Sequence, residues 1–218
     1  MNPKCLIFFS VTVSFLVLGG CNSNTVKDID GNVYETVNIG KQVWMAENLK
    51  TTKYNDGTNI PIVTNYDSWS DLTTPAYCWY NNDINNKKDY GALYNQYVID
   101  SKKICPAGWH VPTYKEWVTL DVYLSDPRIS GGKLKEKGIT HWKSPNTDAT
   151  NETGFSALPG GYRSFNGSFN YIKIYGYWWS STVINRNTYS TQLSYKSGSM
   201  DIYINYQANG LSVRCLKN

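Results

Sequence analysis

The residues able to do acid–base or nucleophilic chemistry are few and scattered along the chain. There are two histidines, His110 and His141, and neither has a Ser or Cys at a spacing that defines a nucleophile pair. A lone histidine is the commonest general base, but His110 lies just before a predicted helix start, where a structural role is the simpler interpretation. Glu116 is better explained as a helix cap than as an acid catalyst. We therefore predict no catalytic residues. A hydrolase with dispersed carboxylates stays an alternative, because such sites leave no local motif.

The most oxygen-rich segment covers residues 146–152, with carboxylates at Asp148 and Glu152 and amides between them. Calcium takes about six to eight oxygen ligands, so these two side chains are the candidate metal ligands. The segment lacks the spacing of an EF-hand, and Asn and Thr side chains commonly bind their own backbone in loops. We predict no cofactor, with calcium at this loop as the alternative.

Aromatic side chains beside polar ones offer the chemistry of carbohydrate binding, in which sugars stack on rings while Asn, Asp and Arg bind hydroxyls. The chain has 8 Trp, 18 Tyr and 6 Phe. Because Phe is scarce, Trp and Tyr must also fill the core, so burial is the alternative role for each ring. Trp178 and Trp179 are expected to point one inward and one outward on a strand. The candidate ligand-binding residues are Trp79, Tyr80, Asn82, Asp83, Tyr162, Arg163 and Trp179.

The first twenty residues indicate export. Lys4 precedes an apolar run from Cys5 to Leu18, which is too short for a hydrocarbon core of about 30 Å and is typical of a secretory signal peptide. Leu18-Gly19-Gly20-Cys21 resembles the lipobox of bacterial lipoproteins, in which the cysteine is acylated and becomes the mature N-terminus. An ordinary signal peptide is the alternative. We predict a lipoprotein signal peptide over 1–20, a lipidated Cys21 with a tether over 21–27, and a lipid-anchored location at the bacterial outer membrane or cell surface.

Composition describes the rest of the chain as one compact domain. The sequence has 218 residues and a formal net charge of +4, from 21 Lys and Arg against 17 Asp and Glu. The basic residues are scattered, so nothing supports nucleic-acid binding. A low charged fraction with many aromatic residues excludes a solvated tail or a coiled coil. No linker interrupts the sequence, and we predict a single domain over 28–218.

Three cysteines remain after the signal peptide and the lipidation site, namely Cys78, Cys105 and Cys215. Export permits a disulfide, an odd number leaves one thiol unpaired, and the wide spacing is unlike that of a zinc site. We favour a bridge between Cys105 and Cys215, which would stabilise the fold by about 4–5 kcal/mol in the chain-entropy model.

One helix is clear in the sequence. Thr113 and Glu116 have the spacing of a capping box, and Trp117, Leu120 and Leu124 follow on one face, which predicts a helix of about three turns. The segment 91–100 is a second helical candidate, and 133–137 predicts a single turn of helix.

Short strands surround these helices. A hairpin is predicted over 33–39 and 43–45, with a tight turn at 55–57. Later strands are predicted near 156–158, 177–181, 190–194, 200–204 and 211–216. This order predicts an α+β fold, a single domain of short antiparallel strands around one or two helices, whose terminal strands meet.

A series of blocks then carries a resemblance across nearly the whole predicted domain. They are DGNVY at 30–34, GKQVWMAENLK at 40–50, YNDG at 54–57, YCWYNND at 77–83, YGALYN at 90–95, CPAGWHVPT at 105–113, EW at 116–117, GFSALPGGYR at 154–163, WWSST at 178–182 and SVRC at 212–215. This series resembles the Fibrobacter succinogenes major paralogous domain family. That family consists largely of exported bacterial lipoproteins, and its molecular function is not established. The resemblance therefore implies a location more than an activity.

Two of these blocks are also similar to a wider group of folds. GWHVPT at 108–113 with Glu116 and Trp117, and VRC at 213–215, look like the helix start and last strand of formylglycine-generating-enzyme-like and C-type-lectin-like folds. This resemblance implies a C-type-lectin-like fold and places Cys105 beside Cys215, in agreement with the favoured bridge. The two cysteines do not match the active-site pair of the formylglycine-generating enzymes, so that activity is not implied.

Together these observations predict a cell-surface lipoprotein whose domain acts in recognition or adhesion without catalysis. Its partners would be the membrane, through the lipid anchor, and a glycan or a surface protein. One alternative is a structural subunit, a tip or a cap, of a surface assembly. The other is a glycan-directed hydrolase.

Overall fold

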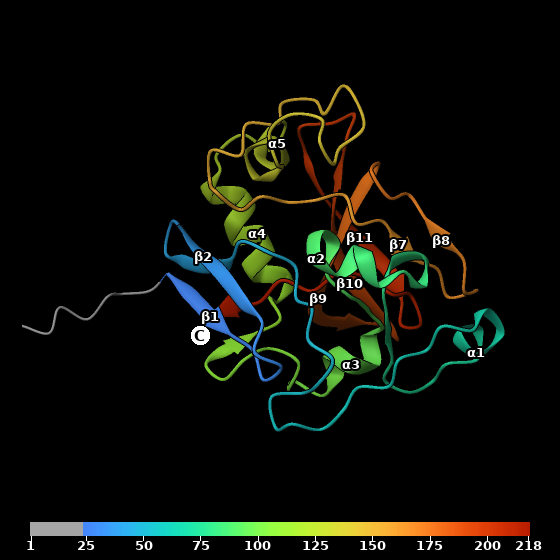
Figure 1. The fold of residues 1–218 in the computed structure, drawn as a ribbon. Helices are drawn as coiled ribbons and strands as arrows, with labels where there is room; N and C mark the ends of the chain where they lie inside the picture. Colours follow the sequence, from blue (N-terminus) through green and yellow to red (C-terminus); the bar gives the residue numbers. More distant parts are fainter. Residues whose placement is uncertain (1–23) are drawn as a thin grey trace, which may run out of the picture.

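The computed structural model describes residues 24–218. The predicted signal peptide and the lipidation site at Cys21 lie outside these residues. The described part has the predicted α+β fold, with short and mostly antiparallel strands and few helices (Figure 1). Nowhere in 24–218 does a helix reach the length and apolar character needed to cross a membrane.

The first sheet joins the two ends of the described chain. Its strand order is β1-β2-β3-β12-β6, with bounds Thr25–Lys27, Val33–Ile39, Gln42–Met45, Leu216–Lys217 and Trp109–His110. Leu216 lies opposite Trp44 on one side and opposite His110 on the other, so the terminal strands meet as predicted. β1 corrects the predicted tether over 21–27. Thr25 and Val26 are β-branched and pair in register with β2, so the folded part begins before residue 28.

The second sheet contains the longest strands. β9 (Tyr175–Ile184), β10 (Asn187–Ser194) and β11 (Met200–Tyr206) form an antiparallel meander in the order β11-β10-β9. Two further strand pairs flank it, β4 (Tyr77–Cys78) with β5 (Leu93–Tyr94) and β7 (Tyr162–Arg163) with β8 (Phe169–Asn170). The predicted strand at 211–216 is shorter than expected, because its first residues make only isolated bridges to β5 and β9.

The clearest predicted helix is confirmed. α4 spans Tyr114–Tyr123 and starts with a capping box in which Thr113 and Glu116 each bind the other's backbone N–H. Trp117, Leu120 and Leu124 are buried. Only the second half of the predicted helix at 91–100 is helical, as α3 (Gln96–Asp100). The first half contains the strand β5.

The other helical segments are short. The turn predicted at 133–137 lies earlier, as α5 (Ser130–Leu134). The remaining segments are α1 (Tyr66–Ser70), η1 (Tyr80–Asn82), η2 (Ile84–Asn86) and α2 (Lys87–Tyr90). Trp69 of α1 and Tyr80 of η1 lie in one core cluster with Cys78 of β4 and Leu93 of β5, and η1 carries two of the predicted ligand-binding residues, Tyr80 and Asn82.

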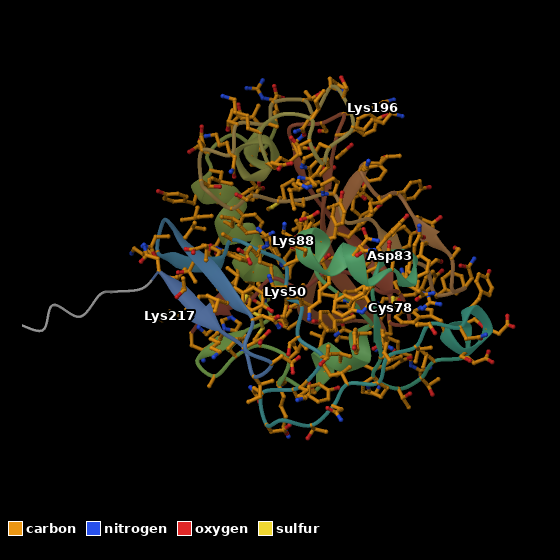
Figure 2. The ribbon with its side chains drawn as sticks, viewed as in Figure 1. Lys50, Cys78, Asp83, Lys88, Lys196 and Lys217 are labelled. Carbon is orange, nitrogen blue, oxygen red and sulfur yellow. A yellow bond between two sulfur atoms is a disulfide. The ribbon has the colours of Figure 1, made fainter. Side chains whose placement is uncertain are left out.

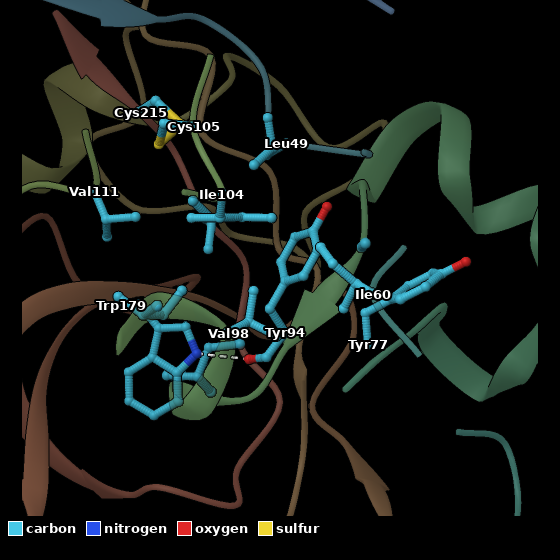
Figure 3. Packing of buried hydrophobic residues seen from close by; sticks show 14 of the residues in the cluster. Leu49, Ile60, Tyr77, Tyr94, Val98, Ile104, Cys105, Val111, Trp179 and Cys215 are labelled. Atoms are coloured by element: carbon cyan, nitrogen blue, oxygen red, sulfur yellow. Dashed lines mark hydrogen bonds between the residues drawn. A yellow bond between two sulfur atoms is a disulfide. The ribbon is translucent and has the colours of Figure 1, made fainter. Parts of the chain in front are cut away.

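The core has two large parts, one on each side of β9. The rings of Trp178 and Trp179 point to opposite faces of this strand, yet both are 0% exposed. Trp178 packs with Trp44 and Phe155, and Trp179 packs with the cluster around Tyr94 (Figure 3). The expectation of one outward ring is wrong, because core residues cover both faces of β9 at this point.

The predicted disulfide between Cys105 and Cys215 is confirmed. It lies in the same core cluster as Trp179, whose indole N–H donates to the carbonyl of Tyr94 at 2.7 Å (Figure 3). Cys215 precedes β12 and Cys105 precedes β6, so the bridge fastens two neighbouring strands of the first sheet.

Candidate ligand-binding surface

Four tyrosine rings form a closed circuit of contacts beside the second sheet. The ring of Tyr162 lies 5.2 Å from Tyr177 and 6.0 Å from Tyr171, measured between centroids. Tyr175 closes the circuit at 5.3 Å from Tyr171 and 5.8 Å from Tyr177. Tyr203 on β11 shares the sheet face of Tyr177, because it lies opposite Ser190 on β10, and Ser190 lies opposite Trp179, two residues beyond Tyr177 on β9. We call these five residues the tyrosine surface.

The tyrosine surface is open to solvent at its edges and packed at its base. Tyr171 and Tyr203 are 49% and 47% exposed, whereas Tyr162 and Tyr177 are half-buried against the core. Burial, and then the neighbouring phenols, raise the pKa of Tyr162 and of Tyr177. Both hydroxyls therefore stay neutral over the physiological range, where each can donate and accept a hydrogen bond.

Two glycines place these rings. Gly161 has φ +62°, and a Cβ there would lie 2.4 Å from the carbonyl oxygen of Asn170. Its N–H donates to the carbonyl of Tyr175, which holds Tyr162 beside β9. Gly176 separates Tyr175 from Tyr177 on β9, and a Cβ there would meet the ring of Trp178 at 2.3 Å. The absent side chains thus let tyrosines line one face while Trp178 fills the other.

Tyr162 alone among the seven predicted ligand-binding residues belongs to the tyrosine surface. Trp79, Tyr80 and Trp179 are 5%, 6% and 0% exposed and pack in the core clusters. These three rings are part of the scaffold rather than of a presented face. Burial was the alternative role for each, and the small number of Phe residues explains it.

Arg163 is also structural, which corrects its predicted place in a ligand site. Its side chain is 1% exposed and lies between the rings of Trp69 and Phe169, at 4.3 and 4.8 Å. The guanidinium donates to the carbonyl of Gly167 and to three carbonyls in the segment 63–65, at 2.7–3.1 Å. Burial lowers its pKa. Beside it, burial raises the pKa of the free thiol of Cys78 to about 12, so this cysteine is an unreactive core residue.

Asn82 and Asp83 are exposed, but each holds a loop in place. The Asn82 amide donates to the carbonyl of Thr64 at 2.8 Å. Asp83 accepts from the N–H of Asn85 at 2.9 Å and caps η2, at the position labelled in Figure 2. Neither Asn82 nor Asp83 belongs to the tyrosine surface.

Lysine side chains supply positive charge at the predicted calcium loop. Glu152 pairs with Lys133 at 3.2 Å, and burial lowers the pKa of Lys135 to about 8, which the charge of Asp148 partly offsets. The Lys135 ammonium donates to the carbonyls of Thr147, Ser194 and Ser197 at 2.7–2.8 Å. Within 24–218, no group of three His, Cys, Asp or Glu side chains is placed to hold a metal ion. A lysine thus supplies the positive charge that these carbonyls bind.

Both histidines contact carboxylates. His110 lies between Asn218, at 2.7 Å, and the capping Glu116, at 3.0 Å. His141 contacts Glu136 at 2.8 Å and lies 3.8 Å from Asp89. Burial would raise the pKa of Glu116, but the hydrogen bonds from Thr113 and the charge of His110 outweigh it and lower that pKa. The capping hydrogen bonds and the contact with His110 therefore explain why the pKa of Glu116 is lowered.

Four members of the tyrosine surface, Tyr171, Tyr175, Tyr177 and Tyr203, are not among the predicted ligand-binding residues, although the sequence carries a signal for two of them. Tyr175 and Tyr177 are two residues apart on a predicted strand, and this spacing places both on one face. Tyr171 lies in a turn and Tyr203 on a different strand, so only the folded chain brings them to the same surface.

Comparison with known proteins gives one match. A family model described as the Fibrobacter succinogenes major domain matches residues 37–217. No curated protein matches the chain significantly, and no solved structure does so.

Proposed function

The chain belongs to the Fibrobacter succinogenes major domain family, and we propose that it is a non-catalytic recognition or adhesion domain that binds carbohydrate through the tyrosine surface. The observation that carries this proposal is the closed circuit of four tyrosine rings, of which Tyr171 is about half exposed, together with the half-exposed Tyr203 on the same face of the sheet. Large exposed aromatic patches on soluble domains mark binding sites.

The chemistry of tyrosine suits a sugar ligand. A ring presents an electron-rich face to the C–H groups of a pyranose, and its hydroxyl donates or accepts a hydrogen bond at the rim. Tyrosine also loses little conformational entropy on binding, since only two torsions are fixed. Contacts among the four rings hold them in place before a ligand arrives, which lowers the cost of binding further.

The proposed setting is the bacterial cell surface. We propose that Cys21 carries the lipid that holds the protein on the outer membrane, with the domain projecting from it on the segment before β1. In this account the domain needs no cofactor and carries out no catalysis. Its task is to keep the cell attached to a glycan or glycosylated surface.

A binding assay with matched variants tests the proposal. The purified protein is screened against a glycan array, and hits are confirmed by titration with Tyr171→Ala and Tyr203→Ala together. Tyr123→Ala is the control, because this ring is 58% exposed on α4, outside the tyrosine surface. Binding that falls at least tenfold in the double variant and not in the control supports the proposal. Silence of the wild type across a broad array would count against it.

The edge strand of the second sheet favours a structural subunit as the second candidate. Among residues 24–218, β11 pairs only with β10 in its sheet, and its Ile204 and Tyr206 are 55% and 61% exposed. An edge without Lys or Pro is open to pairing with a strand from another protein. Crosslinking on intact cells, followed by the same experiment with Ile204→Lys, separates the candidates. A crosslinked envelope partner that this substitution removes, together with no glycan binding, would favour the structural role.

A further inference from the structure

A row of three side chains crosses the second sheet next to the exposed tyrosines. Tyr177 on β9 lies directly opposite Gln192 on β10, and Gln192 lies directly opposite Asp201 on β11. Residues directly opposite each other in antiparallel strands point to the same face. Tyr203 is two residues beyond Asp201 and shares that face. The row therefore puts an amide next to Tyr177 and a carboxylate next to Tyr203 on one face of the sheet.

The amide of Gln192 is the unusual member of the row. The side chain is only 9% exposed, and within 24–218 it makes no side-chain hydrogen bond. Its polar atoms still reach solvent, since they are not among the fully buried atoms that lack a partner. A nearly buried amide is stable only when its N–H and carbonyl groups are paired. At Gln192, the partner has to come from the solvent side, as water or as a ligand hydroxyl.

Asp201 supplies a complementary group beside this amide. One of its carboxylate oxygens accepts from the Ser199 hydroxyl at 3.1 Å, and no ion pair to it is formed by the residues that the structure describes. An ionised carboxylate only accepts hydrogen bonds, whereas an amide both donates and accepts. Two neighbouring sugar hydroxyls can therefore bind here, one donating to Asp201 and the other accepting from Gln192. The same carboxylate repels a sulfate or a uronic acid.

We propose that Gln192 and Asp201 bind the hydroxyls of an uncharged pyranose that stacks on the tyrosine surface, an inference that rests on the proposed function. The ligands would therefore be neutral glycans, and acidic glycans would be rejected. The ring of Tyr177, at one end of the row, and the ring of Tyr203, next to Asp201 at the other end, provide the stacking faces for the sugar. Gln192 is the specificity residue for hydroxyl position, and Asp201 is the residue that selects against negative charge.

Two substitutions test the two roles. The probes are cellopentaose, xylopentaose, mannopentaose and dextran, with dextran sulfate as the charged partner of dextran. Gln192→Ala should weaken the best neutral probe at least tenfold, while Asn59→Ala, which removes an exposed amide elsewhere, leaves it unchanged. Asp201→Asn keeps the size of the side chain and removes its charge. It should lower the ratio of the affinity for dextran to the affinity for dextran sulfate at least fivefold. Thermal unfolding of each variant confirms that the fold is intact.

The outcomes separate this inference from the proposed function. If the wild type binds neutral probes and loses them on Tyr171→Ala and Tyr203→Ala, but Gln192→Ala and Asp201→Asn bind as the wild type does, the inference is overturned while the proposed function stands. A wild type that prefers dextran sulfate also overturns the inference alone. A wild type that binds none of the probes or array glycans overturns both.

Discussion

The rings of Tyr162 and Tyr177 meet edge to face, with centroids 5.2 Å apart and planes at 68°. This contact joins the short β7–β8 pair to the long strand β9, and it is the shortest of the four ring contacts in the tyrosine surface. Aromatic pairs of this geometry contribute about 0.5–1.5 kcal/mol beyond the area that they bury. The contact thus fixes the base of the proposed site before any ligand binds.

Substitution of Gly161 should disturb this contact. Gly161→Ala places a Cβ 2.4 Å from the Asn170 carbonyl at a residue with positive φ, so we expect a loss of roughly 1–3 kcal/mol in the free energy of unfolding and weaker glycan binding. Gly57→Ala is the matched control, because φ is also positive there but the space is open. Urea denaturation compares the two. Equal losses in both variants would show that the close approach at Gly161 is unimportant.

Replacement of Arg163 should destabilise the protein although lysine keeps the charge. Arg163→Lys cannot make four hydrogen bonds to carbonyls while lying flat between Trp69 and Phe169. We expect the free energy of unfolding to fall by about 3 kcal/mol. Arg128→Lys is the control, since the Arg128 side chain is 86% exposed, and should change stability by about 0.5 kcal/mol or less. A similar small change at both positions would contradict the structural role of Arg163.

The capping carboxylate of Glu116 predicts that the stability of the fold depends on pH in the acidic range. Because the folded-state pKa of Glu116 is lowered, its ionised form stabilises the fold above the ordinary carboxyl pKa. This contribution is lost as pH falls through the lowered pKa. Glu116→Gln should therefore cost about 1 kcal/mol at pH 7, and the difference from the wild type should shrink below pH 4. The exposed Glu35→Gln serves as the control in thermal scans across this range. A difference that stays constant down to pH 2 would be inconsistent with an ionised cap.

Removal of the disulfide should lower the free energy of unfolding by a large amount. Cys105→Ser with Cys215→Ser opens a bridge between residues 110 positions apart, and the free energy of unfolding should fall by about 3–5 kcal/mol. Reducing agent should lower the stability of the wild type by a similar amount and leave the double variant unchanged. Mass spectrometry of the unreduced protein gives a second measurement, in which free thiol at Cys105 would contradict the bridge.

The sequence predicts best the parts of the fold that depend on local chemistry. Helix α4 follows from the Thr113–Glu116 capping box, since both hydrogen bonds form within one turn. The first hairpin follows from the β-branched and aromatic residues in 33–39 and the turn at Gly40. Segment 91–100 is harder, because Gly91 at φ +71° and the pairing of Leu93 with Cys78 divide it into strand and helix. That pairing is a tertiary contact and leaves no local pattern.

The candidate site is less predictable for the same reason. Whether a ring is presented depends on what packs over it, as the complete burial of Trp178 and Trp179 on opposite faces of β9 demonstrates. Tyr162 is identified from its polar neighbours, but its neighbour Arg163 points into the core. The pairing of Gln192 with Asp201 follows from strand register, which the alternation of residues in one strand does not specify.

The most direct test of the account is a calorimetric titration of the purified protein with its best neutral array glycan, alongside Tyr171→Ala and Tyr203→Ala together. The account predicts measurable binding by the wild type and a Kd at least tenfold higher in the double variant, with the same unfolding temperature within a few degrees. Equal affinity in the two proteins would contradict it.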